Sequence, residues 1–171
     1  MKITKLNKGQ GIKILFGIYL ILLIWIIIFR MDFSIADIHR VRELNLIPFY
    51  YKDVYAGDIP VFEAVLNLFI FVPFGVYLKM LNVAGRKIFL SGFATSLMFE
   101  VCQYIFKLGA SDITDIITNT LGAVCGVYLY LLFCKIMKDE RKANKIIMII
   151  ATAVSVIMAA FFLLMLISSF M

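Results

Sequence analysis

The sequence predicts an all-α membrane protein: one polytopic bundle of about five transmembrane helices, formed as a single membrane domain by residues 1–171. Of the 171 residues, 63% are hydrophobic and 16% are charged, which leaves too few polar side chains to cover a water-soluble domain. Five apolar stretches also reach the length of about 20 residues that a helix needs to cross the hydrocarbon core. The composition therefore excludes an ordinary soluble enzyme and a disordered chain.

The five predicted spans are 12–29, 61–81, 88–106, 113–134 and 146–168. The first follows three lysines, as in a signal peptide, but has no small-residue cleavage site at its end, so we expect an uncleaved anchor. The next three spans each carry a few polar residues. The last is almost purely apolar and is expected to be a lipid-facing packing helix.

The basic residues predict the orientation of the bundle. Twelve of the 17 Lys and Arg residues lie at the start of the chain and in the loops at about 79–87 and 135–145, and five lie in the other connections. Because cytoplasmic loops carry the excess of basic residues, we expect the N-terminus inside and the C-terminus outside. The chain is therefore predicted to be a multi-pass protein of the cell membrane, with the segment at about 30–60 on its outer face.

The outer segment, about 30–60, has its own pattern. Ser34 and Asp37 resemble a capping box, and four apolar residues follow at near-helical spacing, namely Ile35, Ile38, Val41 and Leu44. We expect a short amphipathic helix on the membrane surface, followed by interfacial aromatics from Phe49 onward. The basic trio His39, Arg40 and Arg42 fits either a solvated face or contact with lipid phosphates. An anchoring segment without chemistry remains an alternative for the whole region.

Polar side chains inside the spans indicate a candidate site, because such groups cost free energy in the membrane unless protein or water satisfies them. Asn67, Glu100 and Asn119 each lie about seven residues from the outer end of their span, which corresponds to a depth of roughly 10 Å. We therefore predict an outward-facing polar pocket lined by Asn67, Glu100, Gln103, Asp115 and Asn119, with Glu63 and Asp112 at its mouth. The alternative is that these groups only bond the helices to one another.

Small residues and a proline predict how the helices pack. Gly122 and Gly126 form a G-x-x-x-G pair that lets a neighbouring backbone approach closely, so we expect span 113–134 to be central. Pro73, followed by Gly75, predicts a kink or local unwinding in span 61–81.

The same residues bear on cofactors and partners. His39 is the only histidine and the three cysteines lie apart inside apolar runs, so we expect no metal, although acidic and amide oxygens leave a hard cation as an alternative. We see no nucleophile motif and expect no cofactor. The basic residues are not interleaved with aromatics, which argues against nucleic acid. Membrane lipids are the expected partners.

Four short motifs, in order and spacing, resemble the VanZ-like family over about 45–130. They comprise Asn45, Pro48 and Phe49 in the outer segment; Asn67, Pro73 and Gly75; Glu100 and Gln103; and Gly109, Asp112, Ile113, Asp115, Asn119, Gly122 and Gly126. Two positions depart from the pattern. Thr114 stands where members often have an acidic residue, and Ala110 where many have Arg.

The resemblance implies a bacterial integral membrane protein, related to one linked with low-level resistance to teicoplanin and lipoglycopeptides, and no established reaction. We expect the outer pocket to bind an amphiphile, either a lipid-linked wall precursor or the drug's lipid tail. One alternative is a membrane enzyme acting on a lipid headgroup or a lipid-linked wall precursor, with Glu100 or Asp115 as general acid or base. Another is a structural subunit that packs through Gly122 and Gly126 against another membrane protein. The oligomeric state is left open.

Overall fold

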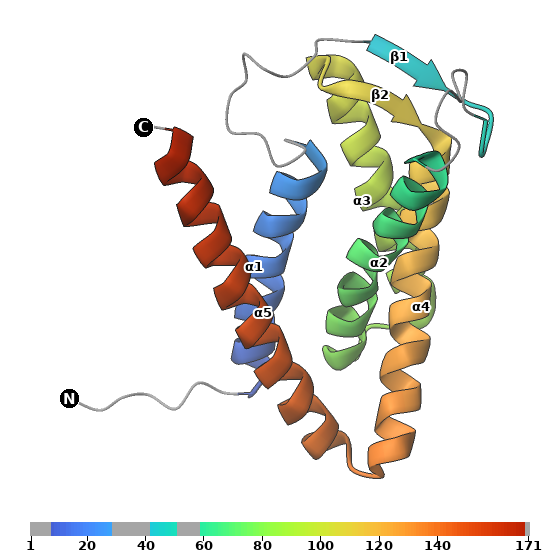
Figure 1. Ribbon diagram of the computed structural model, residues 1–171. Coiled ribbons are helices and arrows are strands. Elements are labelled where there is room, and N and C mark those ends of the chain that lie inside the picture. Colours follow the sequence, from blue (N-terminus) through green and yellow to red (C-terminus); the bar gives the residue numbers. More distant parts are fainter. Residues whose placement is uncertain (1–7, 29–41, 51–58, 170–171) are drawn as a thin grey trace.

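The computed structural model describes residues 8–28, 42–50 and 59–169 of the chain. This part contains five helices and two short strands, in the order α1 (Lys8–Ile28), β1 (Arg42–Asn45), α2 (Ile59–Met80), α3 (Gly85–Phe106), β2 (Gly109–Asp112), α4 (Ile113–Met137) and α5 (Glu140–Ser169). The helices run along a common direction, and the two strands lie over the ends of α3 and α4 (Figure 1). We call this end of the bundle the strand end.

The predicted fold class is confirmed. All five helices are long and apolar enough to cross a membrane. The largest difference from the predicted spans is that α5 begins at Glu140 and not near Ile146. It begins there because Asp139 caps the helix: its Oδ1 accepts the N–H groups of Arg141 at 2.8 Å and Lys142 at 3.2 Å.

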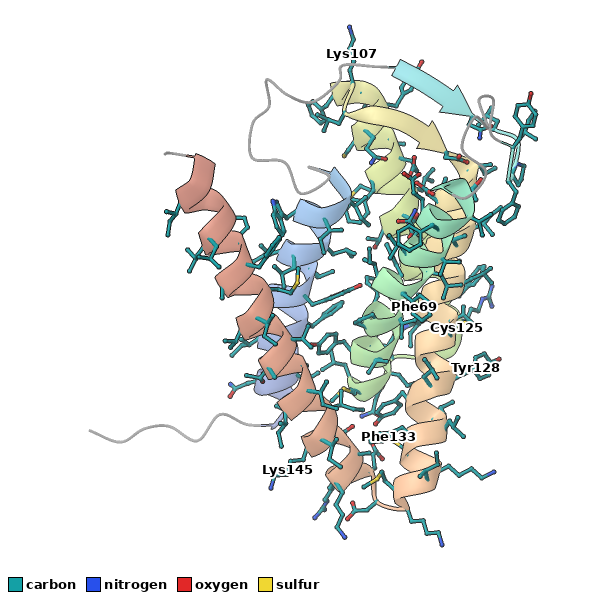
Figure 2. All side chains as sticks on the ribbon, viewed as in Figure 1. Phe69, Lys107, Cys125, Tyr128, Phe133 and Lys145 are labelled. Carbon is teal, nitrogen blue, oxygen red and sulfur yellow. The ribbon has the colours of Figure 1, made fainter. Side chains whose placement is uncertain are left out.

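Basic residues are divided unequally between the two ends of the bundle. Among the described residues, nine Lys and Arg side chains lie near the end opposite the strands, namely Lys13, Lys79, Arg86, Lys87, Lys135, Lys138, Arg141, Lys142 and Lys145. Lys107 lies at the strand end, whereas Lys145 lies at the opposite end (Figure 2). The outward position of the strand end stays a prediction from this distribution of charge.

The predicted surface helix is wrong at its C-terminal end, where the chain forms β1. Its strand pairs in parallel with β2, so that Arg42 lies opposite Gly109 and Asn45 opposite Asp112. The backbone groups of this segment are satisfied by a partner far along the sequence, which overrides the local helical spacing that ends at Leu44. The earlier part of the predicted helix, with Ser34 and His39, lies outside the described residues.

The closest helix contact joins α2 and α4 through glycines. A Cβ atom on Gly122 would overlap the carbonyl group of Leu68, and one on Gly126 would overlap that of Val72. Gly75 on α2 makes the reciprocal contact, because a Cβ atom there would overlap the backbone of α4. The absence of side chains lets the two backbones touch, as small residues do at membrane helix interfaces. The prediction of a central span with a close approach at this glycine pair is confirmed.

Pro73 does not unwind α2, which is helical from Ile59 to Met80. A proline removes one backbone donor and crowds the preceding turn, and in a membrane the carbonyls there need other partners. The hydroxyl of Tyr19 on α1 donates to the carbonyl oxygen of Ile70, one turn before the proline, at 2.8 Å. Of the predicted kink or local unwinding, unwinding is not found, because the helix is continuous, and the kink stays a prediction. Beside this turn lies a buried apolar core formed by Leu23, Phe71, Phe74, Ile88, Phe99 and Ala123.

The last helix, α5, is peripheral. Over residues 146–164 no described side chain is buried. Among its contacts with α1, Met148 lies beside Gly11, and the rings of Trp25 and Phe162 meet edge to face with centroids 5.0 Å apart. Ile147, Met148 and Ala151 also pack against the buried cluster that contains Ile12 and Leu15. The largely exposed surface agrees with the prediction of a peripheral packing helix, and its contact with lipid stays a prediction.

Candidate functional site

A tight corner joins α3 to α4 at the strand end. Lys107 adopts a left-handed conformation with φ 57° and ends α3, after which the N–H of Leu108 bonds to the carbonyl of Gln103 at 2.9 Å. The chain then forms β2, and Asp112 caps α4 by accepting the N–H of Thr114 at 2.7 Å. The corner therefore brings the last turns of α3 beside the first turn of α4.

Glu100 lies inside this corner and is only 5% exposed. Its Oε2 accepts the backbone N–H of Asp112 at 2.9 Å, and its carbonyl oxygen accepts the hydroxyl of Ser111 at 2.8 Å. Hydrogen bonds to a carboxylate are among the stronger ones in proteins. Glu100 thus fixes β2 and the cap of α4 against α3.

Asn45 connects the outer segment to the same corner. Its Nδ2 donates to Oδ2 of Asp112 at 3.0 Å and to the carbonyl of Tyr50 at 2.7 Å, while its Oδ1 accepts the N–H of Ile47 at 3.2 Å. The Asn45 amide therefore links the outer segment to the capping residue of α4 and also closes the turn that follows β1. The two carboxyl oxygens of Asp112 are shared between this amide and the α4 cap.

The turn after β1 is also held by α4 directly. The N–H of Phe49, which has a φ of 57°, donates to Oγ1 of Thr114 at 3.0 Å. Pro48 lies exposed at the tip of the same turn. The motif residues Asn45, Pro48 and Phe49 thus form a turn anchored on the first turn of α4. Thr114, where the sequence departs from the VanZ-like pattern, supplies the anchor.

A second polar cluster lies deeper between α3 and α4. Nδ2 of Asn119 donates to Oγ of Ser96 at 2.8 Å, and Ser96 donates to the carbonyl oxygen of Asp115 at 3.4 Å. Thr118 donates to the carbonyl of Thr114 at 3.0 Å. Asn119 and Ser96 are almost completely buried. Oδ1 of Asn119 forms no hydrogen bond with a described residue, so this buried cluster holds a hydrogen-bond acceptor without a described donor.

Three residues of the predicted pocket lie apart from these two clusters. Nε2 of Gln103 donates to the carbonyl of Ile27 on α1 at 3.1 Å, and Gln103 therefore joins α3 to α1. Asn67 is half-buried on α2, and no hydrogen bond links it to another described residue. Glu63 is exposed near the start of α2. The structure brings Glu100 and Asp112 together and places Asn119 with the backbone of Asp115. A single pocket formed by all seven residues stays a prediction.

An apolar groove runs along the outer side of α3 and α4 and ends at the Glu100 corner. It has a volume of about 680 Å³, within the usual range for ligand sites. From α3 it is lined by a stripe of apolar side chains at every fourth position, namely Phe89, Phe93, Leu97 and Val101. Isoleucines of α4 form the other wall, and Glu100, Ser111 and Asp112 lie at its polar end.

The hydroxyl groups of the site were not among the residues predicted from the sequence. Ser96, Ser111, Thr114 and Thr118 are all buried. Ser96 precedes Glu100 by four residues and so shares its helix face, a signal that was present in the sequence. Ser111 and Thr114 flank Asp112, but their bonds depend on the corner geometry. A neutral hydroxyl costs little free energy inside a membrane helix. The energetic argument that singled out the charged residues therefore does not single out these hydroxyls.

Among the residues that the structure describes, no group of three His, Cys, Asp or Glu side chains is close enough together to hold a metal ion. The thiols of Cys102, Cys125 and Cys134 are free and half-buried in α3 and α4. They behave as small apolar residues of the helix surfaces.

These features define a multi-pass membrane protein whose bundle carries a hydrogen-bonded polar corner at one end. A family model described as VanZ/LLP1 matches residues 16–134. Protein VanZ of Enterococcus faecium is 37% identical over 154 residues, which covers 86% of this chain and 89% of that protein. No solved structure matches the chain. The chain belongs to the VanZ/LLP1 family.

Proposed function

We propose that this protein lowers the susceptibility of a Gram-positive cell to teicoplanin-type lipoglycopeptides by binding an amphiphile at the strand end of its bundle. Membership of the VanZ/LLP1 family supports the role in resistance. The site is the groove between α3 and α4 together with the polar corner at Glu100 and Asp112. The amphiphile is either a lipid-linked wall precursor or the lipid tail of the drug.

The observation that carries this proposal is the continuity of an apolar groove with buried polar groups. An alkyl chain would lie against Phe93, Leu97 and Val101, which are 40% to 47% exposed and form one stripe. A polar head would then reach the end of the groove at Glu100 and Asp112. Ligand sites commonly combine an apolar lining with a few fixed polar groups that set orientation.

The predicted orientation is consistent with this function. Glycopeptides act on lipid-linked precursors at the outer face of the membrane, and the excess of basic residues at the other end predicts that the strand end is outside. The groove would then open to the outer leaflet, where both candidate ligands are found.

The first test is the substitution Glu100→Gln. Glutamine keeps the side-chain shape and an oxygen that can accept the N–H of Asp112, but it removes the charge. The wild-type protein and the variant are expressed at matched membrane levels in a sensitive Gram-positive host. We expect the wild type to raise the inhibitory concentration of teicoplanin more than that of vancomycin, which lacks the lipid tail. We expect E100Q to lose this difference, and full protection by E100Q contradicts the proposal.

A second pair of variants tests the groove itself. Leu97→Trp places a large side chain in the groove, whereas Met98→Trp adds the same bulk to an exposed position of α3 that does not line it. We expect L97W to reduce protection against teicoplanin and M98W to retain it. Equal protection by the two variants would show that the groove is not used.

The same strains separate the alternatives. A membrane enzyme predicts a lipid or wall-precursor species that is present with the wild type and absent with E100Q. A partner subunit predicts a membrane protein that crosslinks in constant proportion. The glycine pair Gly122 and Gly126 is not the surface for such a partner, because α2 of the same chain covers it. That part of the subunit hypothesis is wrong.

A further inference from the structure

A second groove lies between α1 and α5, at the end of the bundle opposite the strands. Its volume is about 860 Å³. Ile12 lines it from α1, and the first turns of α5 supply the rest of its described wall. The side chain of Lys145 projects from this end of α5 (Figure 2). The groove is separate from the polar corner and takes no part in the function proposed above.

The polar end of this groove is strongly basic. Arg141, Lys142 and Lys145 line it within the first two turns of α5. The N-terminal end of a helix carries a partial positive charge, so cations at this position are unfavourable unless an anion is nearby. Three cations and a helix terminus therefore produce a local field that attracts negative charge.

Two neighbouring acids offset part of this charge, since Asp139 and Glu140 line an adjoining hollow together with Arg141 and Asn144. Asp139 caps α5 through the N–H groups of Arg141 and Lys142, and Glu140 accepts the hydroxyl of Tyr130 on α4 at 3.2 Å. Among the described residues, no carboxylate lines the groove. Three cations against two adjoining acids leave a net positive charge at this end of the groove.

Beyond the cations the groove becomes apolar. Met148, Ile149 and Ala153 follow on the same side of α5, one to three turns further into the membrane, and Ile12 faces them. A cationic end that continues into an apolar channel matches the two parts of a phospholipid, a phosphate headgroup and an acyl chain. Basic pockets between membrane helices on the cytoplasmic side are typical sites for anionic lipid headgroups.

We propose that this groove binds an anionic phospholipid. Its phosphate lies among Arg141, Lys142 and Lys145, and one acyl chain lies along Met148 and Ile149. A zwitterionic lipid carries an amine that these cations repel, so the site selects for net negative charge. Because charge predicts this end of the bundle to be cytoplasmic, the lipid comes from the inner leaflet.

The experiment measures the lipids that copurify with the full-length protein. The protein is expressed in a host whose membrane holds phosphatidylethanolamine and phosphatidylglycerol, extracted in mild detergent, and its bound lipids are quantified by mass spectrometry. We expect phosphatidylglycerol to be enriched over the whole membrane extract. The variant R141Q/K142Q/K145Q is expected to bind at least about fivefold less, since each cation near the headgroups contributes about this factor. Absence of enrichment in the wild type overturns the proposal.

A matched control separates a site from general surface charge. R86Q/K87Q/K135Q removes the same charges at the same end of the bundle, from exposed positions outside the groove. We expect this control to keep the bound phosphatidylglycerol. An equal loss in the two triple variants shows only diffuse attraction and overturns the site.

Two variants that leave the charge of the protein unchanged test the site if the triple variant fails to fold. Ala153→Trp fills the apolar part of the groove, and Val156→Trp adds the same bulk to an exposed position of α5 that does not line it. We expect A153W to lower the bound phosphatidylglycerol and V156W to leave it unchanged. Equal lipid content in the two variants overturns the proposal.

Discussion

The α2–α4 pair and the α1–α5 pair pack by different physical means. Between α2 and α4, three glycines bring backbone against backbone, so that no Cβ atom fits at Gly75, Gly122 or Gly126. Between α1 and α5, side chains such as Trp25 and Phe162 meet at ring distance, and most of α5 is exposed. Because lipid tails are as apolar as the helices, only close backbone packing and hydrogen bonds hold one arrangement firmly. The first pair is therefore a rigid frame and the second a looser attachment.

The family model follows the same division, although the similarity to VanZ covers 86% of the chain and therefore extends into α5. The VanZ/LLP1 model covers residues 16–134, from within α1 to the last turn of α4, and ends before α5. The polar corner is carried by α3 and α4 within this frame, whereas the basic groove uses α5. We expect the first four helices to be sufficient for the polar corner, because α3 and α4 carry its described residues.

The largest effect is expected from Gly126→Ala. The added Cβ overlaps the carbonyl of Val72 on α2, and overpacking of a tight interface costs roughly 1 to 3 kcal/mol of folding free energy. Gly17→Ala is the control, because a Cβ there meets nothing within 4 Å and alanine favours a helix by about 1 kcal/mol over glycine. Thermal unfolding in detergent should show a lower midpoint for G126A and no decrease for G17A. An unchanged midpoint for G126A would mean that the helices are not in backbone contact.

The second-largest effect on stability is expected from replacing the residues that cap α4 and α5. Asp112 and Asp139 each accept backbone N–H groups at the start of a helix, so replacing either with alanine should cost about 1 kcal/mol of stability. Asp112 also bonds to Asn45 at the proposed site. We expect D112A and D139A to lower the unfolding midpoint similarly, but only D112A to lose protection against teicoplanin. Loss of protection in both variants would trace the effect to stability and not to the site.

The sequence predicted the elements whose backbone bonds are local, and it failed to predict those whose bonding partners lie far along the chain. The helices were predictable, because the membrane requires about 20 apolar residues with their backbone bonds satisfied inside each span. The strand β1 was not, because it forms only against β2, so that Asn45 meets a residue 67 positions away. A local pattern carries no information about such a pairing.

The candidate site shows the same limit. Glu100 and Asp112 were predictable neighbours, because a short connection joins their spans at one end. Gln103 lies three residues further along α3, which turns its side chain by about 60° from Glu100, and this rotation directs it to α1. Sequence spacing predicts which residues share a helix face. The arrangement of the other helices around α3 decides what that face meets.

The smallest effect is expected from removing α5 altogether, in a chain that stops after Met137. This truncation removes apolar packing against α1 and the hydrogen bonds that Tyr130 forms with Glu140 and Asn144. The α1 surface that α5 covers is apolar and can face lipid at little cost, since the membrane supplies no hydrophobic force between helices. We therefore expect this variant to reach the membrane and to protect against teicoplanin as the full chain does, while it binds less phosphatidylglycerol. Loss of protection at a normal membrane level would show that the first four helices do not function alone, and the comparison drawn between the two helix pairs would be wrong.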